Sequence, residues 1–175
     1  MYIVIYIIVG FLAIIALVAL LAPKTYEVNR SVIVNKPVSE VFKYLKYLKN
    51  QDQWSPWKKK DPNMKQEFIG VDGEVGFISK WQGNKLVGTG EQEIIGVEQN
   101  KQISSELRFF KPWKSVSSAF IKVDGVDATQ TNVTWGFTAK NPMPMNIFML
   151  LFNFEKTVGK DFEAGLDSLK DILES

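Results

Sequence analysis

The chain has 175 residues, and its 21 Lys and Arg nearly balance its 19 Asp and Glu, which leaves a formal net charge of +2. So small a positive excess argues against nucleic-acid binding. The absence of Cys and His excludes disulfides, thiolate nucleophiles and Cys-bearing zinc sites, and it removes the usual general base at neutral pH. The composition therefore favours binding over catalysis, with no metal or cofactor expected.

The first 22 residues contain no Asp, Glu, Lys or Arg, and all but Gly10 are hydrophobic. A helix of this length spans about 33 Å, enough to cross a hydrocarbon core of about 30 Å. We therefore predict one transmembrane helix over residues 1–22, a short linker over 23–25 and a globular domain over 26–175. A cleaved signal peptide is the alternative, but no basic residue precedes the apolar run, which is longer than a usual signal-peptide core.

The charges beside this apolar run predict its orientation. No cation precedes it, whereas Lys24, Arg30 and Lys36 follow it closely. Because basic residues favour the cytoplasmic side of a membrane, we expect a single-pass protein whose domain lies in the cytoplasm.

The domain begins with the β-branched segment Tyr26 to Asn35, which predicts a strand that ends before Pro37. Apolar residues then recur at helical spacing from Val38 to Leu48, which predicts an amphipathic helix. Residues 51–63 follow as an irregular loop with two tryptophans, two prolines and three consecutive lysines.

Turn residues divide the next part of the chain into six segments of strand character. These are Met64 to Ile69, Gly73 to Gln82, Lys85 to Val97, Gln102 to Phe110, Ser115 to Val123 and Asn132 to Lys140. Six strands without an intervening helix predict an antiparallel sheet. The tail from Met145 to Ser175 predicts a long helix with an apolar stripe through Leu151, Phe154, Val158, Phe162, Leu166, Leu169 and Leu173.

This α+β order of elements is distinctive, whereas the individual motifs are structural rather than catalytic. The segments that carry a family resemblance are Val28 to Ser39, Trp54 to Trp57, Asp61 to Met64, Gly73 to Trp81, Gly88 to Glu91 and Phe162 to Leu173. Over residues 26–174 the chain resembles the START-related (SRPBCC, polyketide cyclase-like) superfamily. The resemblance implies a helix-grip fold, in which a curved antiparallel sheet of about seven strands surrounds the C-terminal helix. It also implies a concave space for a hydrophobic small molecule or lipid, and a few members are enzymes.

Large aromatic side chains on the inner faces of the sheet and the tail helix are the candidates for ligand contact. On a strand, Trp135 shares one face with Phe137, and Trp81 is on the corresponding face of another strand. An inward Arg108 would need a carboxylate or an anionic ligand head. The predicted ligand-contact residues are Trp81, Arg108, Trp135, Phe137, Phe154 and Phe162. Ordinary core packing, and an outward Arg108, are the alternatives.

Two segments that interleave Trp, Pro and Lys, at 54–60 and 111–114, have the composition of membrane-surface loops. We expect Trp54, Trp57, Lys58 and Trp113 to contact the bilayer. The alternative is that the first segment packs over the cavity as a lid and that its lysines are merely solvated.

The sequence thus predicts a membrane-anchored module that binds a hydrophobic or amphipathic small molecule or lipid. A cyclase or dehydratase that acts on a polyketide-like substrate is the first alternative, although no catalytic arrangement is evident. Glu91 and Glu93 share a strand face, but a salt bridge to Arg108 is the simpler role for them. An interaction module with a filled interior and no ligand is the second alternative.

Overall fold

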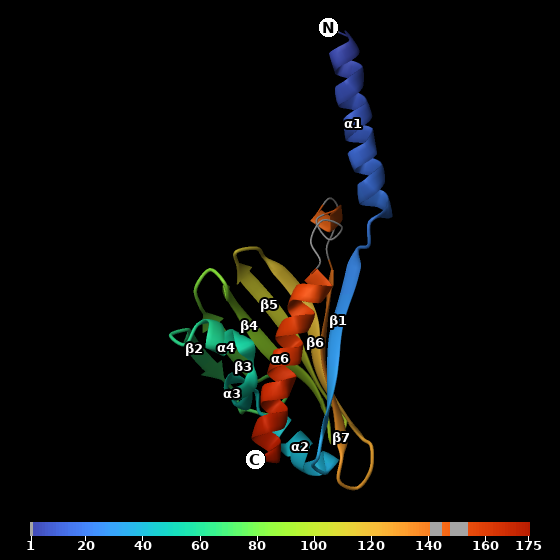
Figure 1. Ribbon diagram of the computed structural model, residues 1–175. Coiled ribbons are helices and arrows are strands. Elements are labelled where there is room, and N and C mark those ends of the chain that lie inside the picture. The colour runs from blue at the N-terminus through green and yellow to red at the C-terminus, as the bar shows by residue number, and fades with distance from the viewer. Residues whose placement is uncertain (1, 141–144, 148–153) are drawn as a thin grey trace.

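The computed structural model describes residues 2–140, 145–147 and 154–175 (Figure 1). Its helical elements are α1 (Tyr2–Leu21), α2 (Val38–Leu45), η1 (Leu48–Asn50), α3 (Gln51–Trp54), α4 (Pro56–Lys60), η2 (Met145–Ile147) and α6 (Phe154–Glu174). Its strands are β1 (Thr25–Val34), β2 (Lys65–Ile69), β3 (Ile78–Gln82), β4 (Thr89–Glu98), β5 (Gln102–Lys111), β6 (Ser115–Gly125) and β7 (Thr131–Lys140).

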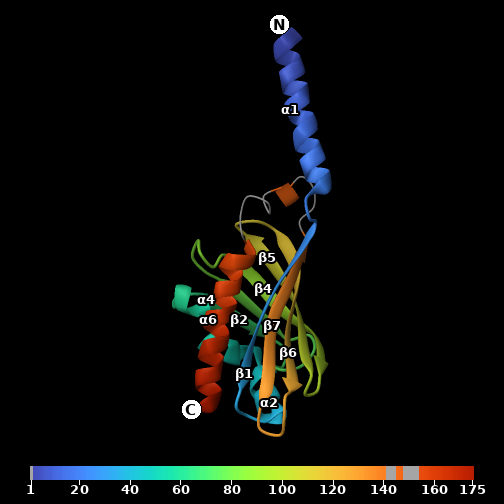
Figure 2. The same cartoon turned by 45° about the vertical axis from the view of Figure 1, so that its right-hand side comes forward.

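Helix α1 projects away from the rest of the molecule, and nearly all of its residues are exposed (Figures 1 and 2). It is long and apolar enough to cross a membrane. Only residues 22–24 separate it from β1. The side chain of Asn146 donates hydrogen bonds to the carbonyl oxygens of Ala19 (2.7 Å) and Ala22 (3.0 Å). These carbonyls at the C-terminal end of a helix lack intrahelical partners, so Asn146 both satisfies them and ties α1 to the domain.

The seven strands form one antiparallel sheet in the order β1-β7-β6-β5-β4-β3-β2. The sheet curves around α6, which confirms the predicted helix-grip architecture (Figure 1). Register shifts interrupt the β4–β5 pairing on either side of residues 90–94. Such irregularities bend a strand and increase its twist, so they contribute to the curvature of the sheet.

The strand register brings two loops to the end of the sheet where α1 joins. Thr25 at the start of β1 lies opposite Lys140, and Ala139 lies opposite Ser117 near the start of β6. Farther across the sheet, Lys111 at the end of β5 lies opposite Thr89. We call this end of the sheet the anchor end. The β3–β4 loop (83–88) and the β5–β6 loop (112–114) both lie there, as does the start of α6 (Figure 2).

Helix α6 runs along β1, where its apolar stripe packs as predicted through Phe162, Leu166 and Leu169. Its described part begins at Phe154, later than the predicted start at Met145, and Leu151 lies outside the described residues. Arg30 on β1 forms ion pairs of 2.6 Å with both Glu155 and Glu163 of α6. The helix is thereby held over the β1–β7 side of the sheet.

Large apolar residues fill the space beneath α6 at the end of the sheet remote from α1. Strands contribute Ile103, Ile121, Val123 and Val133, which pack against α2 and the C-terminal half of α6. Helix α2 buries Val41, Phe42 and Leu45, as its apolar spacing predicted. This end of the domain therefore has a closed hydrophobic core.

Two predicted strands begin later than expected. Residues 73–77 form a turn rather than the start of β3, and residues 85–88 belong to the β3–β4 loop rather than to β4. Both segments contain glycines with positive φ, at Gly73, Gly76 and Gly88, a backbone conformation that strands do not use. The irregular segment at 51–63 contains the short helices α3 and α4.

Gly90 provides a test of the tight packing in the curved part of β4. A Cβ atom there would lie 2.5 Å from the carbonyl oxygen of Arg108 and 2.6 Å from the Trp81 ring. We expect Gly90→Ala to lower the free energy of unfolding by about 1–3 kcal/mol, because the strand and the ring must both move. Thermal or urea unfolding of the detergent-solubilised chain measures this effect.

Gly96 in the same strand is the matched control. A Cβ atom there meets only the Ser104 side chain, at an ordinary contact distance of 3.5 Å. Gly96→Ala should therefore be neutral or stabilising by up to about 1 kcal/mol. Equal destabilisation by the two substitutions would show that the crowding at Gly90 is not the cause.

Candidate ligand-binding site

A cavity of about 390 Å³ lies between the concave face of the sheet, helix α6 and the α3–α4 segment. This volume falls within the range of small-molecule binding sites. Most of the wall is apolar. The lining residues are Tyr26, Leu48, Gln51, Asp52, Ser55, Trp57, Lys58, Met64, Gln66, Ser79, Trp81, Val87, Gln92, Leu107, Phe109, Ser115, Ser117, Ala119, Trp135, Phe137, Ala139, Val158 and Phe162.

Small side chains on the inner face of β6 explain why the cavity exists. Ser115, Ser117 and Ala119 line it, whereas Ile121 and Val123, further along the same face, belong to the closed core. The side-chain volume on this face therefore falls toward the anchor end. Because α6 is held over β1 and β7, it does not approach the sheet here to compensate, and the space stays open.

An aromatic cluster forms the wall beneath α6. The rings of Trp135 and Phe162 stack with centroids 4.2 Å apart and an interplanar angle of 14°. Trp57 packs edge-on against both rings, and Phe137 packs edge-on against Phe162. Each such pair contributes about 0.5–1.5 kcal/mol beyond its burial, so this wall is rigid and preformed.

Gly165 on α6 allows this wall to form. A Cβ atom at this position would lie 2.8 Å from the Trp135 ring. Tight packing, rather than space for a ligand, therefore accounts for this glycine, and the helix backbone lies directly against the indole.

A polar cluster lies in the opposite wall, where α3, α4 and β2 meet. Lys58 Nζ donates to Gln66 Oε1 at 2.8 Å, and Gln66 Nε2 lies 2.9 Å from both carboxylate oxygens of Asp52. All three side chains are half-buried. An ammonium group has three protons, and Lys58 has one further contact, a long one of 3.5 Å to the carbonyl of Met64. Lys58 can therefore also donate to a polar group inside the cavity.

Among the residues that the structure describes, three with titratable side chains line the cavity: Asp52, Lys58 and Tyr26. Burial raises the pKa of Tyr26 above its usual value of 10.0, so its hydroxyl stays protonated at neutral pH. Within the described part of the chain, no group of three or more acidic side chains could hold a metal ion. The cavity therefore combines a large apolar surface with one polar end.

The structure brings four of the predicted ligand-contact residues together around the cavity: Trp81, Trp135, Phe137 and Phe162. The side chain of Phe154 lies outside the described part of the structure. Trp81 packs edge-on against Phe109, with ring centroids 5.7 Å apart, on the β3–β5 side of the cavity.

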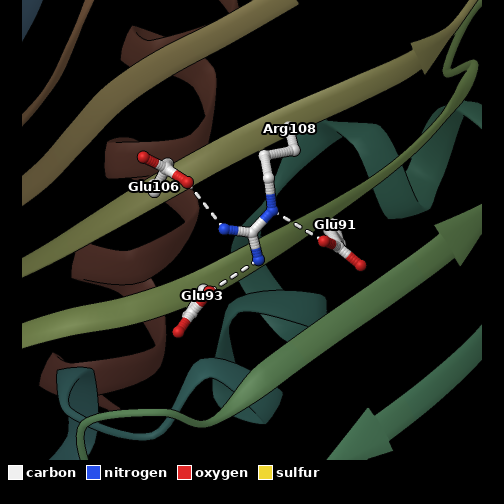
Figure 3. Close-up of polar contacts among 4 residues, drawn as sticks. All are labelled: Glu91, Glu93, Glu106 and Arg108. Atoms are coloured by element: carbon white, nitrogen blue, oxygen red, sulfur yellow. Dashed lines mark hydrogen bonds and ion pairs between the residues drawn. The ribbon is translucent and has the colours of Figure 1, made fainter.

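The prediction for Arg108 is corrected. Leu107 and Phe109 face the cavity, so Arg108 between them lies on the outer face of the sheet. Its guanidinium donates to Glu91, Glu93 and Glu106, each at 2.6 Å (Figure 3). These bonds raise its already high pKa, with Glu93 contributing most. The network also explains the pair Glu91 and Glu93 as a salt-bridge site outside the cavity.

The four residues expected at the membrane surface separate into three environments. Trp54 is only 1% exposed and packs edge-on against Trp135, so it belongs to the core and cannot contact a bilayer. Trp57 and Lys58 line the cavity, as a lid would. Trp113 is 76% exposed at the anchor end.

Sequence reasoning missed the small residues Ser115, Ser117 and Ala119 and the polar cluster of Asp52, Lys58 and Gln66. A signal for the first group was present. On alternate positions of β6, three small residues precede two large aliphatic ones, which indicates a face whose packing changes along the strand. The polar cluster depends on how α3 and α4 pack against β2. The spacing of apolar residues in the sequence does not predict that packing.

Comparison with known proteins identifies the family and the fold of this chain. The family model described as polyketide cyclase / dehydrase and lipid transport matches residues 25–174. No curated protein matches the chain in sequence.

Solved structures share the fold at low sequence identity. Norcoclaurine synthase from Thalictrum flavum aligns with a TM-score of 0.62 and 12% identity, over 85% of this chain and 86% of its own. The Aha1 dimer from Colwellia psychrerythraea aligns with a TM-score of 0.57 and 18% identity, over 85% and 96%. The di-domain ARO/CYC StfQ of the steffimycin biosynthetic pathway aligns with a TM-score of 0.61 and 9% identity, over 86% and 51%. These likenesses establish the helix-grip fold, and the match of the family model over residues 25–174 confirms the predicted resemblance to the polyketide cyclase-like superfamily.

Proposed function

The chain belongs to the polyketide cyclase / dehydrase and lipid transport family, and we propose that it is a membrane-anchored protein that binds an amphipathic small molecule or lipid between its sheet and α6. The cavity of about 390 Å³ is the observation that carries this proposal. A binding site needs space that the protein does not fill itself, and the small side chains of β6 supply it.

The chemistry of the walls suggests an amphipathic ligand rather than a purely apolar one. The aromatic cluster around Trp135 and Phe162 would pack against an acyl chain or a ring system. At the opposite wall, Lys58 would donate a charge-assisted hydrogen bond to a carboxylate, phosphate or carbonyl oxygen. Asp52, which lies beside Gln66, would disfavour a second negative charge deeper in the same wall.

The anchor is the second part of the proposal. Helix α1 would span the bilayer once, and Lys24 beside it would favour a cytoplasmic domain. A tethered domain meets membrane-derived ligands at a high effective concentration. The short connection through residues 22–24 keeps the cavity close to the membrane.

A cavity-filling substitution tests the binding site. Ala119 is buried in the cavity wall, and a phenyl ring in its place would fill part of the cavity. We expect native mass spectrometry to detect co-purified lipid or amphiphile on the detergent-solubilised wild-type chain. Ala119→Phe should retain at most about a tenth of that amount, because the ring and the ligand compete for one volume.

Ser118→Phe is the matched control, because the neighbouring residue on the same strand is exposed on the outer face. It should retain ligand as the wild type does. If Ala119→Phe fails to fold, Ser117→Leu fills the same wall with a smaller side chain. A wild-type chain that is always empty, or a cavity-filling variant with undiminished ligand, would contradict the proposal.

The role of Lys58 is tested with a fatty-acid probe. We expect Lys58→Met to weaken the binding of cis-parinaric acid about 10- to 100-fold, the usual effect of losing a hydrogen bond to a charged group. Binding of the corresponding neutral alcohol should change little. Fluorescence titration measures both affinities.

Lys59→Met is the control for a general effect of charge, since Lys59 is exposed and contacts Ser168 instead of the cavity. Equal losses of affinity in the two lysine variants would exclude a specific role for Lys58.

Labelling of a single introduced cysteine tests the orientation, because the natural chain has none. Val126 is 55% exposed in the β6–β7 turn. A membrane-impermeant maleimide should label Val126→Cys in bacterial spheroplasts only after lysis, since the domain would be cytoplasmic. Labelling of intact spheroplasts would place the domain on the outer side.

A further inference from the structure

Large apolar side chains are exposed at the anchor end of the sheet, most fully in two loops and less so at Phe110 and Val116 on the adjoining strands. Leu86 in the β3–β4 loop is 77% exposed, and Trp113 in the β5–β6 loop is 76% exposed. The two loops lie against each other, since a Cβ atom on Gly88 would meet the carbonyl oxygen of Lys111. Exposed apolar residues that gather at one place indicate an interaction surface. The cavity itself does not involve either side chain.

Lysines flank these two residues in the sequence. Lys85 precedes Leu86, Lys111 and Lys114 lie on either side of Trp113, and Lys24 precedes β1 at the same end of the sheet. The carboxylate of Asp61 reaches these loops, where it accepts a hydrogen bond from the backbone N–H of Asn84. The opposite end of the sheet has mixed charge, because its β2–β3 and β6–β7 turns contain Asp72, Glu74 and Asp127, whereas Lys36 and Lys101 follow β1 and β4. Aromatic and aliphatic side chains among lysines are typical of a surface that meets anionic lipid headgroups.

A second hollow, of about 310 Å³, lies between these loops. It shares Trp57, Val87, Phe109 and Ser115 with the wall of the main cavity, and its remaining lining residues include Leu86 and Trp113. The hollow therefore lies between the main cavity and the tips of the two exposed loops, with four side chains common to both walls.

The connection to α1 limits how far this opening can lie from the bilayer. Three residues, 22–24, separate α1 from β1, and a fully extended chain of that length spans about 10 Å. Asn146 donates hydrogen bonds to the carbonyls of Ala19 and Ala22 at this end of α1. If α1 crosses the membrane, the anchor end of the sheet faces the headgroups.

We propose that the β3–β4 and β5–β6 loops form a portal that inserts into the surface of an anionic bilayer through Leu86 and Trp113, and that the ligand passes directly between the bilayer and the cavity through it. This proposal rests on the proposed binding function. It adds the source of the ligand, which is the membrane that holds α1, and the route by which the ligand enters.

Insertion is tested with the full chain in phosphatidylcholine vesicles that contain phosphatidylglycerol. Single cysteines at Leu86→Cys, Trp113→Cys and, as the control, Val126→Cys are labelled with the environment-sensitive dye NBD. Val126 is also an exposed apolar residue, but it lies in the turn at the opposite end of the sheet. We expect blue-shifted emission, quenched by headgroup-proximal spin-labelled lipid, at positions 86 and 113 only. If the dye at all three positions has the same emission spectrum as it has in water, the proposal is overturned.

The route is tested by the kinetics of cis-parinaric acid transfer from these vesicles. The double variant Leu86→Ser/Trp113→Ser should slow loading of the cavity at least about fivefold and leave the final occupancy unchanged, since neither residue lines the main cavity. An unchanged loading rate would overturn the portal even if the loops insert.

The two proposals fail in different ways. A wild-type chain that never binds the fatty acid contradicts the binding function, whereas normal occupancy without insertion or without a rate effect contradicts the portal alone. Lys85→Glu/Lys114→Glu provides a second variant with an unaltered apolar tip. It should reduce insertion only in vesicles that contain phosphatidylglycerol, because the lysines act through the anionic headgroups.

Discussion

The balance of side-chain volume beneath α6 is the constraint on which the rest of this structure depends. Phe162 stacked on Trp135 and the ion pairs of Arg30 hold the helix over β1 and β7. From there, large aliphatic residues fill the remote end of the sheet, whereas Ser115, Ser117 and Ala119 leave the anchor end open. Larger residues in this space would bury more apolar surface and stabilise the fold further. A bound ligand would bury that surface in their place.

The same geometry relates the cavity to α1, the helix that is long and apolar enough to cross a membrane. Antiparallel pairing returns every second loop to the same end of the sheet, so the loops at 83–88 and 112–114 lie at the end where α1 joins β1. If α1 were joined at the opposite end of the sheet, it would lie near the acidic turns at Asp72 and Asp127 instead. Helix α1 and the two loops of the proposed portal therefore share one end of the sheet.

Sequence patterns predicted those features that depend on local periodicity. The alternation in β7 placed Trp135 and Phe137 on the inner face, and the stripe of α6 placed Phe162 there. The face of Arg108 could not be derived, because alternation pairs it with Glu106 and does not say which face of β5 is concave. Trp54 and Trp57 belong to one short motif, yet one is core and the other cavity wall, since the turn between α3 and α4 separates them. Such differences arise from tertiary packing, which single-sequence patterns do not encode.

A crystal structure of the full chain purified from membranes in mild detergent tests the central claim most directly. The account predicts elongated electron density between α6 and the sheet, in contact with Trp135, Phe137 and Leu107, with a polar end near Lys58 Nζ. Density that shows the protein's own side chains closing the space above Ala119 and Ser117, with no room for a bound molecule, would contradict it.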